Sequence, residues 1–191
     1  TTMANKDSAF GLKPIGKVGQ NRDAQGLSEY SIAASATAIY FQDPVKAANT
    51  GTIAVAAAGD VLLGSLNGVF FTDATTSKPT FANNLKAANT ATDIVGFVSD
   101  DPYERFEIQS DNTTASAQTD VFMNYDILYA AGDSANYVSK VELDDSTTSA
   151  TSGQLKVIGV SKDPDNDELG ASHVNFVVNI NEHFLKQTAG V

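Results

Sequence analysis

Short segments in which apolar and polar residues alternate place the strongest constraint on the fold of this chain. In the clearest of them, Val174, Phe176, Val178 and Ile180 fall on one side of a two-residue period and asparagines fall on the other. Side chains of a β-strand point alternately to opposite faces, so residues 174–181 are predicted to form a half-buried strand. Similar short segments, alternating or continuously apolar, lie at residues 30–32, 53–55, 61–63, 94–98, 106–108, 127–129 and 157–160.

The spacing of these segments favours an all-β fold. They are separated by turn signals such as Asn49-Thr50-Gly51, whereas no stretch carries a clear amphipathic helical stripe. We therefore predict an antiparallel β-barrel or sandwich, jelly-roll-like in form. Residues 74–92, 110–120 and 144–153 are rich in Ser, Thr, Asn and Ala and are predicted to be long polar surface loops. Such loops either contact a neighbouring subunit or are plainly mobile.

The first 26 residues differ from the rest of the chain. They hold four glycines and Pro14, and their apolar residues keep no regular period. We expect an extended N-terminal arm at 1–26, followed by a single β-rich domain at 27–191. Such an arm can add to a neighbour's sheet or fill its grooves, or its apolar side chains can pack on their own domain. The candidate partner-binding residues of the arm are Phe10, Leu12, Lys13, Ile15 and Lys17.

Charge divides the chain in the same place. The net charge is −11, yet residues 1–22 hold four basic residues against Asp7, a balance of +3 that leaves −14 on the remainder. Nucleic-acid phosphates repel an acidic body, which gains nothing from counterion release. We therefore expect no nucleic-acid partner for the body. The basic arm either docks on an acidic protein surface or is a solvated tail.

Several other classes of protein are disfavoured by composition. The chain has no cysteine, which excludes disulfides, thiolate metal sites and cysteine nucleophiles. No apolar run approaches the roughly 20 residues that span a bilayer, so no membrane association is expected. Met3-Ala4-Asn5 is typical of a native start, and no secretory signal follows it. These features predict a soluble protein that is made in a cytoplasm and is not exported by the usual route.

The sharpest metal-site candidate is the stretch Asp163-Pro164-Asp165-Asn166-Asp167-Glu168. Asp163, Asp165 and Asp167 alternate as the first oxygen ligands of a calcium loop do. However, Glu168 stands where such a loop needs glycine, and Val174 stands where it needs a bidentate glutamate. The pattern therefore favours an acidic turn, and we expect neither a resident metal nor any other cofactor.

No catalytic constellation is evident. The adjacent pairs Asp100-Asp101 and Asp144-Asp145 are typical of turns that point to water. His173 and His183 are ten residues apart, over 30 Å in a fully extended strand, so they are not expected to share a metal. Serine-hydrolase and phosphate-binding motifs are absent. We expect a protein that is not an enzyme.

A series of short motifs, in this order along the chain, resembles a family of small structural proteins encoded in the head-gene clusters of tailed phages, marine phages and prophages among them. The arm carries Ala9-Phe10-Gly11-Leu12-Lys13-Pro14, with lysine where the common form has arginine. The remaining matches are Met3–Lys6, Tyr30–Ala33, Gln42–Lys46, Ala58–Asp60, Gly64, Gly68-Val69, Asp100–Pro102, Phe106–Gln109, Asp163–Asn166, Gly170-Ala171 and Val178–His183.

The resemblance implies a capsid decoration, or cement, protein that clamps adjacent capsid subunits and stabilises the phage head. Its partners would be the major capsid protein and further copies of itself, with a trimer favoured over a dimer. It would lie on the outer capsid surface of the virion, where an acidic body avoids the packaged DNA. The alternative is a phage tail or host-binding module, stabilised by calcium at Asp163, Asp165 and Asp167.

Overall fold

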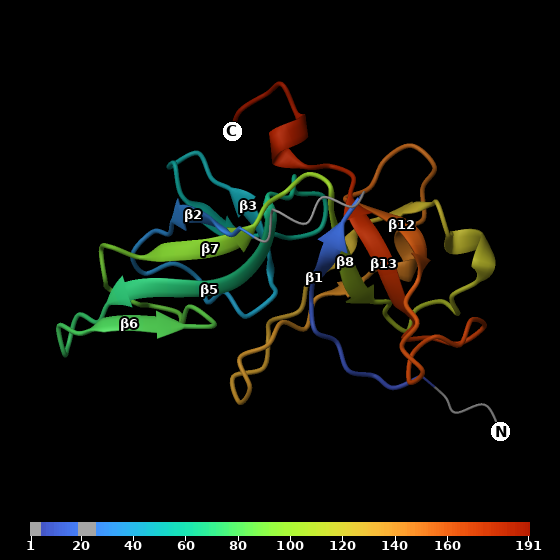
Figure 1. Ribbon diagram of the computed structural model, residues 1–191, viewed down its shortest axis with the longest axis horizontal. Helices are drawn as coiled ribbons and strands as arrows, with labels where there is room; N and C mark the ends of the chain where they lie inside the picture. The colour runs from blue at the N-terminus through green and yellow to red at the C-terminus, as the bar shows by residue number, and fades with distance from the viewer. Residues whose placement is uncertain (1–4, 19–25) are drawn as a thin grey trace.

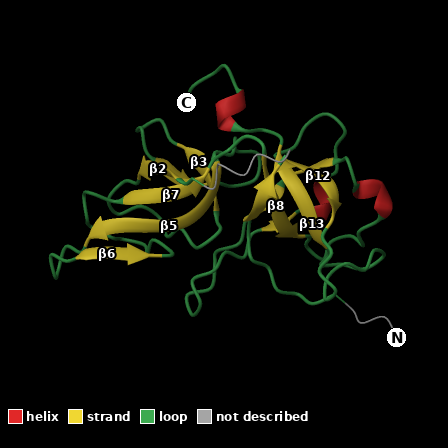
Figure 2. Ribbon diagram, viewed as in Figure 1, coloured by secondary structure: helices red, strands yellow, loops and turns green. Residues whose placement is uncertain are grey.

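The computed structural model describes residues 5–18 and 26–191, whose regular structure is nearly all β-strand (Figure 1). Antiparallel sheets pack as a sandwich, which confirms the all-β prediction and, of its two forms, the sandwich. No closed barrel forms among the described residues. Figure 2 shows the short 3-10 helices that interrupt the strands. They are η1 (Gln118–Asp120), η2 (Asp145–Thr147) and η3 (Phe184–Lys186).

A five-stranded sheet forms one side of the molecule. Its strands, in spatial order, are β1 (Lys13–Lys17), β8 (Glu104–Gln109), β13 (Asn175–Ile180), β12 (Leu155–Val160) and β9 (Asn124–Tyr125). All neighbours in this sheet are antiparallel. A two-stranded sheet, β10 (Ile127–Leu128) with β11 (Glu142–Leu143), contributes Ile127 and Leu143 to the same hydrophobic core.

A six-stranded sheet lies beside the first (Figure 1). Its main path, in spatial order, is β2 (Ser28–Ser31), β7 (Val95–Ser99), β5 (Gly64–Thr72), β3 (Pro44–Ala47) and β4 (Ile53–Val55). Strand β6 (Pro79–Ala82) pairs with the far half of β5. The predicted loop at 74–92 was therefore wrong in part, because it contains β6 and the fully buried Leu85, which bridges to Ile39.

Strand β13 shows how the sequence pattern maps onto the structure. Val174, Phe176, Val178 and Ile180 are all at most 1% exposed and lie in one core, as the two-residue period predicted. The side chain of Asn175 lies on the opposite face but is also buried, because other segments of the chain cover that end of the sheet. Alternation thus identified the strand correctly but not the cover on its second face.

The buried apolar side chains form two clusters. The first core underlies the five-stranded sheet, and the second core underlies the six-stranded sheet. Consecutive residues connect them, since Leu62 lies in the first core and Leu63 in the second. The single domain expected for residues 27–191 remains a prediction. The structure has two separate cores, joined at Leu62 and Leu63.

Residues 5–17 of the predicted arm pack on their own chain. Strand β1 pairs with β8, and Leu12 is fully buried in the first core. Gly11 adopts a left-handed φ of +78°, and a Cβ there would lie 2.3 Å from the carbonyl oxygen of Gln42. Glycine is therefore the residue that allows this close crossing. The predicted native start at Met3 and the charge of Arg22 fall outside the described residues.

No helix among the residues that the structure describes is long and apolar enough to cross a membrane.

Candidate functional site

The five candidate arm residues occupy different environments. Leu12 is fully buried, while Lys13 pairs with Glu107 at 3.0 Å and Lys17 pairs with Asp101. Phe10 is half-buried under the Lys13 ammonium, 5.8 Å from its ring centre, whereas Ile15 is 47% exposed. Four of the five thus make contacts within the chain, and partner binding by the arm stays a prediction that rests on the exposed Ile15.

The aspartates at 163–167 form a turn. The Asp163 carboxylate accepts hydrogen bonds from the Asp165 backbone N–H at 3.1 Å and from the Asn175 side-chain amide at 3.2 Å. Asp165 and Asp167 are exposed, and these three carboxylates do not form a ligand cluster among the described residues. The geometry is that of the acidic turn that the sequence favoured.

His183 lies at the junction between the two sheets. It is 1% exposed, its Nδ1 accepts a hydrogen bond from the Leu185 N–H at 3.1 Å, and it thereby caps η3. Burial lowers the pKa of its imidazole to about 4, helped by the Lys186 charge. A buried neutral histidine in this role holds the C-terminal segment in place.

Three aromatic rings gather on the outer face of the six-stranded sheet, and we call Phe70, Phe81 and Phe97 the aromatic patch. Phe70 and Phe81 are direct cross-strand partners with ring centres 4.7 Å apart, and Phe81 and Phe97 stack at 6.3 Å with 17° between their planes. Alternation explains their position, because Val69 and Val98, their chain neighbours, point into the second core. Phe81 is 74% exposed, so the patch presents a large apolar surface to solvent.

The strand that carries Phe81 has two further properties of a contact surface. Among the described residues β6 pairs only with β5, so its other edge is an open row of backbone groups. Residues 74–92, which include β6, hold no Asp or Glu although the chain has 23 acidic residues. Sequence analysis missed this site because Phe81 stands alone in a polar stretch, and only strand pairing brings Phe70 and Phe97 beside it.

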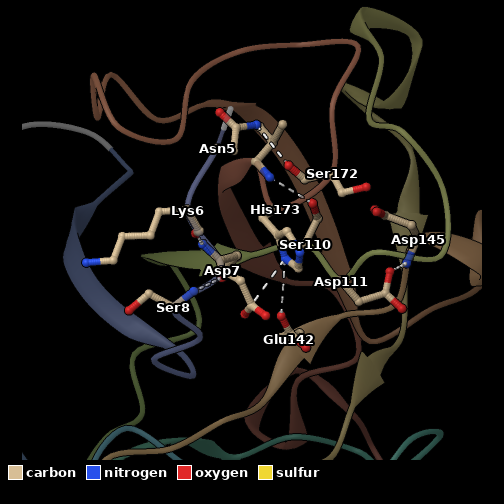
Figure 3. A network of polar contacts seen from close by, with 12 residues as sticks. Asn5, Lys6, Asp7, Ser8, Ser110, Asp111, Glu142, Asp145, Ser172 and His173 are labelled. Atoms are coloured by element: carbon tan, nitrogen blue, oxygen red, sulfur yellow. Dashed lines mark hydrogen bonds and ion pairs between the residues drawn. The ribbon is translucent and has the colours of Figure 1, made fainter. Parts of the chain in front are cut away.

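A polar network joins the N-terminal segment to the far end of the five-stranded sheet (Figure 3). The Asn5 side-chain amide donates to the carbonyl oxygens of Glu168 and Ser172, at 3.0 and 2.9 Å. The Gln109 side chain accepts from the Ser8 N–H at 2.8 Å and donates to the Lys6 carbonyl at 3.0 Å. These contacts fix the backbone on both sides of Asp7.

Asp7 is thereby held close to two other ionisable side chains. The Nδ1 of His173 lies 4.0 Å from a carboxylate oxygen of Asp7 and 3.8 Å from one of Glu142. Among the described residues, these three side chains form a group whose candidate ligand atoms all lie within 4.8 Å of one another. Burial raises the pKa of Glu142 to about 7, together with the nearby charges of Asp7 and Asp111.

Asp145 lies behind this group, at the start of η2. Burial raises the pKa of Asp145 to about 8, and the charges of Asp111 and Asp120 add to the effect. One of its carboxylate oxygens is buried with no hydrogen-bond partner, so the prediction that the Asp144-Asp145 pair points to water was wrong for Asp145. No local sequence pattern predicts this cluster, because its members are far apart in the chain. They are Asp7, Asp111, Glu142, Asp145 and His173.

No protein-family model, curated protein or solved structure matches this chain.

Proposed function

We propose that the chain is a capsid decoration protein of a tailed phage, a non-enzymatic virion component that docks on the major capsid protein at the outer surface of the head. The aromatic patch is the observation that carries this proposal. The order of motifs along the chain, which resembles head-cluster structural proteins, and the all-β sandwich support it.

The physical basis for docking is the chemistry of the patch. Phe, Tyr and Trp side chains each bury about 150–250 Å² when covered, and aromatic anchors dominate the energetics of many protein interfaces. Phe81 is exposed at 74% and is braced by Phe70 and Phe97, so little side-chain entropy is lost when a partner covers it. The shell offers many symmetric copies, so modest contacts accumulate into strong clamping.

The distribution of charge also favours docking through the aromatic patch. The stretch 74–92 carries Lys78 and Lys86 and no acidic residue, whereas the chain as a whole has a net charge of −11. The packaged DNA repels an acidic protein, but this stretch opposes neither an acidic nor a neutral capsid surface. We therefore assign the patch to the capsid protein, and the remaining acidic surface to solvent.

His183 fits a structural role. His183 is buried and caps η3, so it does not face a substrate. The tail or host-binding alternative depended on calcium at 163–167, where the carboxylates instead serve a turn.

Binding to heads tests the proposal directly. The purified chain is mixed with tailed-phage heads assembled without it, and the bound fraction is measured by sedimentation over a range of concentrations. We expect saturable binding, with a loss of roughly 30-fold or more in affinity for Phe81→Ser, since losing a central aromatic anchor costs about 2 kcal/mol or more.

Phe122→Ser is a matched control, because Phe122 is 75% exposed but lies outside the patch between η1 and β9. It should bind heads as the unchanged chain does. Failure of the unchanged chain to bind, or equal binding by Phe81→Ser, would overturn the proposal. Light scattering measures the oligomeric state of the same variant. If Phe81→Ser dissociates an oligomer of the chain but still binds heads, the patch joins copies of the chain and the proposal is wrong.

Cryo-electron microscopy of the source virion gives an independent test. We expect density for the chain on the outside of the head. Density in the tail would instead support the host-binding alternative.

A further inference from the structure

We propose that Asp7, Glu142 and His173 form a binding site for a divalent transition metal of the zinc type, which fastens the N-terminal segment to the body. The proposal is independent of docking on a capsid, because the site lies at the far end of the five-stranded sheet and shares no residue with the aromatic patch.

The three side chains come from three separate segments. Asp7 precedes β1, Glu142 begins β11, and His173 lies in the loop before β13. Their candidate ligand atoms lie within 4.8 Å of one another, with His173 Nδ1 at 4.0 Å from Asp7 and 3.8 Å from Glu142. Zinc bonds of about 2.0–2.2 Å place tetrahedral ligands about 3.3–3.6 Å apart, so the two distances from His173 must shorten by about half an ångström and the distance between the carboxylates by at most about 1.5 Å.

The imidazole nitrogen supplies a second observation. His173 Nδ1 is buried and has no hydrogen-bond partner, and Figure 3 shows it facing both carboxylates. A buried polar atom normally has a partner, and a divalent cation seated between the nitrogen and the two oxygens would supply one. The backbone of His173 is fixed on both sides, since its N–H donates to Asp111 and its carbonyl oxygen accepts from Asn166 at 2.6 Å.

The carboxylates around Asp7, Glu142 and His173 also favour binding of a cation. Asp111 is 3% exposed and, like Asp145, makes no ion pair with Lys or Arg among the described residues. Lys6, the nearest lysine along the chain, turns its ammonium away from the cluster in Figure 3. Carboxylates gathered without a basic side chain repel one another, and a divalent ion relieves that repulsion.

The ligand set selects the class of metal. Calcium and magnesium take oxygen ligands almost exclusively, whereas one imidazole with two carboxylates suits zinc and its first-row neighbours. Three protein ligands leave a fourth position for water, for which the exposed Asp7 side of the group has room, since the Asp7 side chain is 74% exposed.

The binding experiment uses the full chain after dialysis against a chelator. Zinc is titrated by calorimetry at neutral pH, thermal melting is followed with and without zinc, and cobalt provides a visible absorption spectrum that reports its ligands. We expect one zinc per chain, a rise in melting temperature, and a loss of at least about tenfold in affinity for Glu142→Gln and His173→Gln.

Asp7→Asn keeps the test decisive even where His173→Gln fails to fold, because Asp7 is exposed and its replacement leaves both cores untouched. It should weaken zinc binding at least about tenfold. Asp163→Asn, in the acidic turn, is the matched control and should bind zinc normally. Absence of saturable zinc binding, normal binding by Asp7→Asn and Glu142→Gln, or an equal response to calcium would overturn the proposal.

Discussion

The outer faces of the two large sheets meet their surroundings in opposite ways. On the five-stranded sheet the polar Gln109 and Asn175 are only 1% and 3% exposed, because residues 5–8 and the 163–168 turn cover them. On the six-stranded sheet the apolar Phe81 is 74% exposed. Whether a side chain on these faces is buried depends on which segments of the chain cover the face. The polarity of the residue does not predict it.

This contrast separates two kinds of surface. The polar face is completed by the chain itself, whose N-terminal segment pairs the buried amides that water would otherwise solvate. The aromatic face has no such cover among the described residues, which is why we propose it as a contact surface. We therefore expect changes on the first face to affect folding and changes on the second to affect binding.

The largest effect is expected where the N-terminal segment enters the first core. Leu12→Ala should reduce the free energy of unfolding by about 2–5 kcal/mol, because Leu12 is fully buried and its truncation leaves a cavity. Urea denaturation measures the change. Ile15→Ala, three residues on and 47% exposed, should remain within about 0.5 kcal/mol of the unchanged chain. Equal stability of both variants would show that the segment does not complete the fold.

The crossing of the N-terminal segment over Gln42 comes next. Gly11→Ala should cost about 2 kcal/mol, because it imposes a left-handed φ on alanine and places Cβ 2.3 Å from a carbonyl oxygen. The matched control is Gly159→Ala, since nothing lies within 4 Å of a Cβ built there. Chemical denaturation compares the two variants. A smaller loss at Gly11 than at Gly159 would contradict the close crossing.

The cluster of Asp145 with Asp111 should make the free energy of unfolding depend on pH. The folded-state pKa of Asp145 is raised to about 8, above its unfolded value, so its favourable contribution exists at low pH and is lost as pH rises through 8. Asp145→Asn removes the charge and should stabilise the chain at pH 8.5 by an amount on the order of 1 kcal/mol, with little difference near pH 4. Denaturation in metal-free buffer at both pH values measures this, and a gain that is larger at pH 4 would refute it.

The smallest effect on stability is expected at the aromatic patch. Phe81→Ser should change the free energy of unfolding by at most about 1 kcal/mol, the value of a cross-strand aromatic pair, because Phe81 is largely exposed. A loss as large as that of Leu12→Ala would place the patch among the residues that hold the fold together. Together with the binding test on heads, a small loss would sharpen the division between a folding face and a docking face.

The sequence predicted those strands whose pattern of apolar residues does not depend on which strand they pair with. Period-two alternation located β13, and short apolar runs located β7 and β12, because a face turned to a core selects apolar side chains wherever that core lies. Strand β6 was missed, since Phe81 is apolar on the exposed face and carries no alternation signal of burial. The acidic turn at 163–168 was also predictable, because glycine and glutamate are missing where a calcium loop needs them.

The β class of this chain, its uneven charge and the turn at 163–168 were predictable from the sequence alone, because they depend on neighbouring residues and on composition. The tertiary structure was needed to show that Asp7, Glu142 and His173 meet, that three phenylalanines from β5, β6 and β7 lie side by side, and that Leu12 fills the first core. Each of these depends on strand pairing and on the path of the N-terminal segment, which join residues up to 166 positions apart, and local patterns carry no information about such pairings.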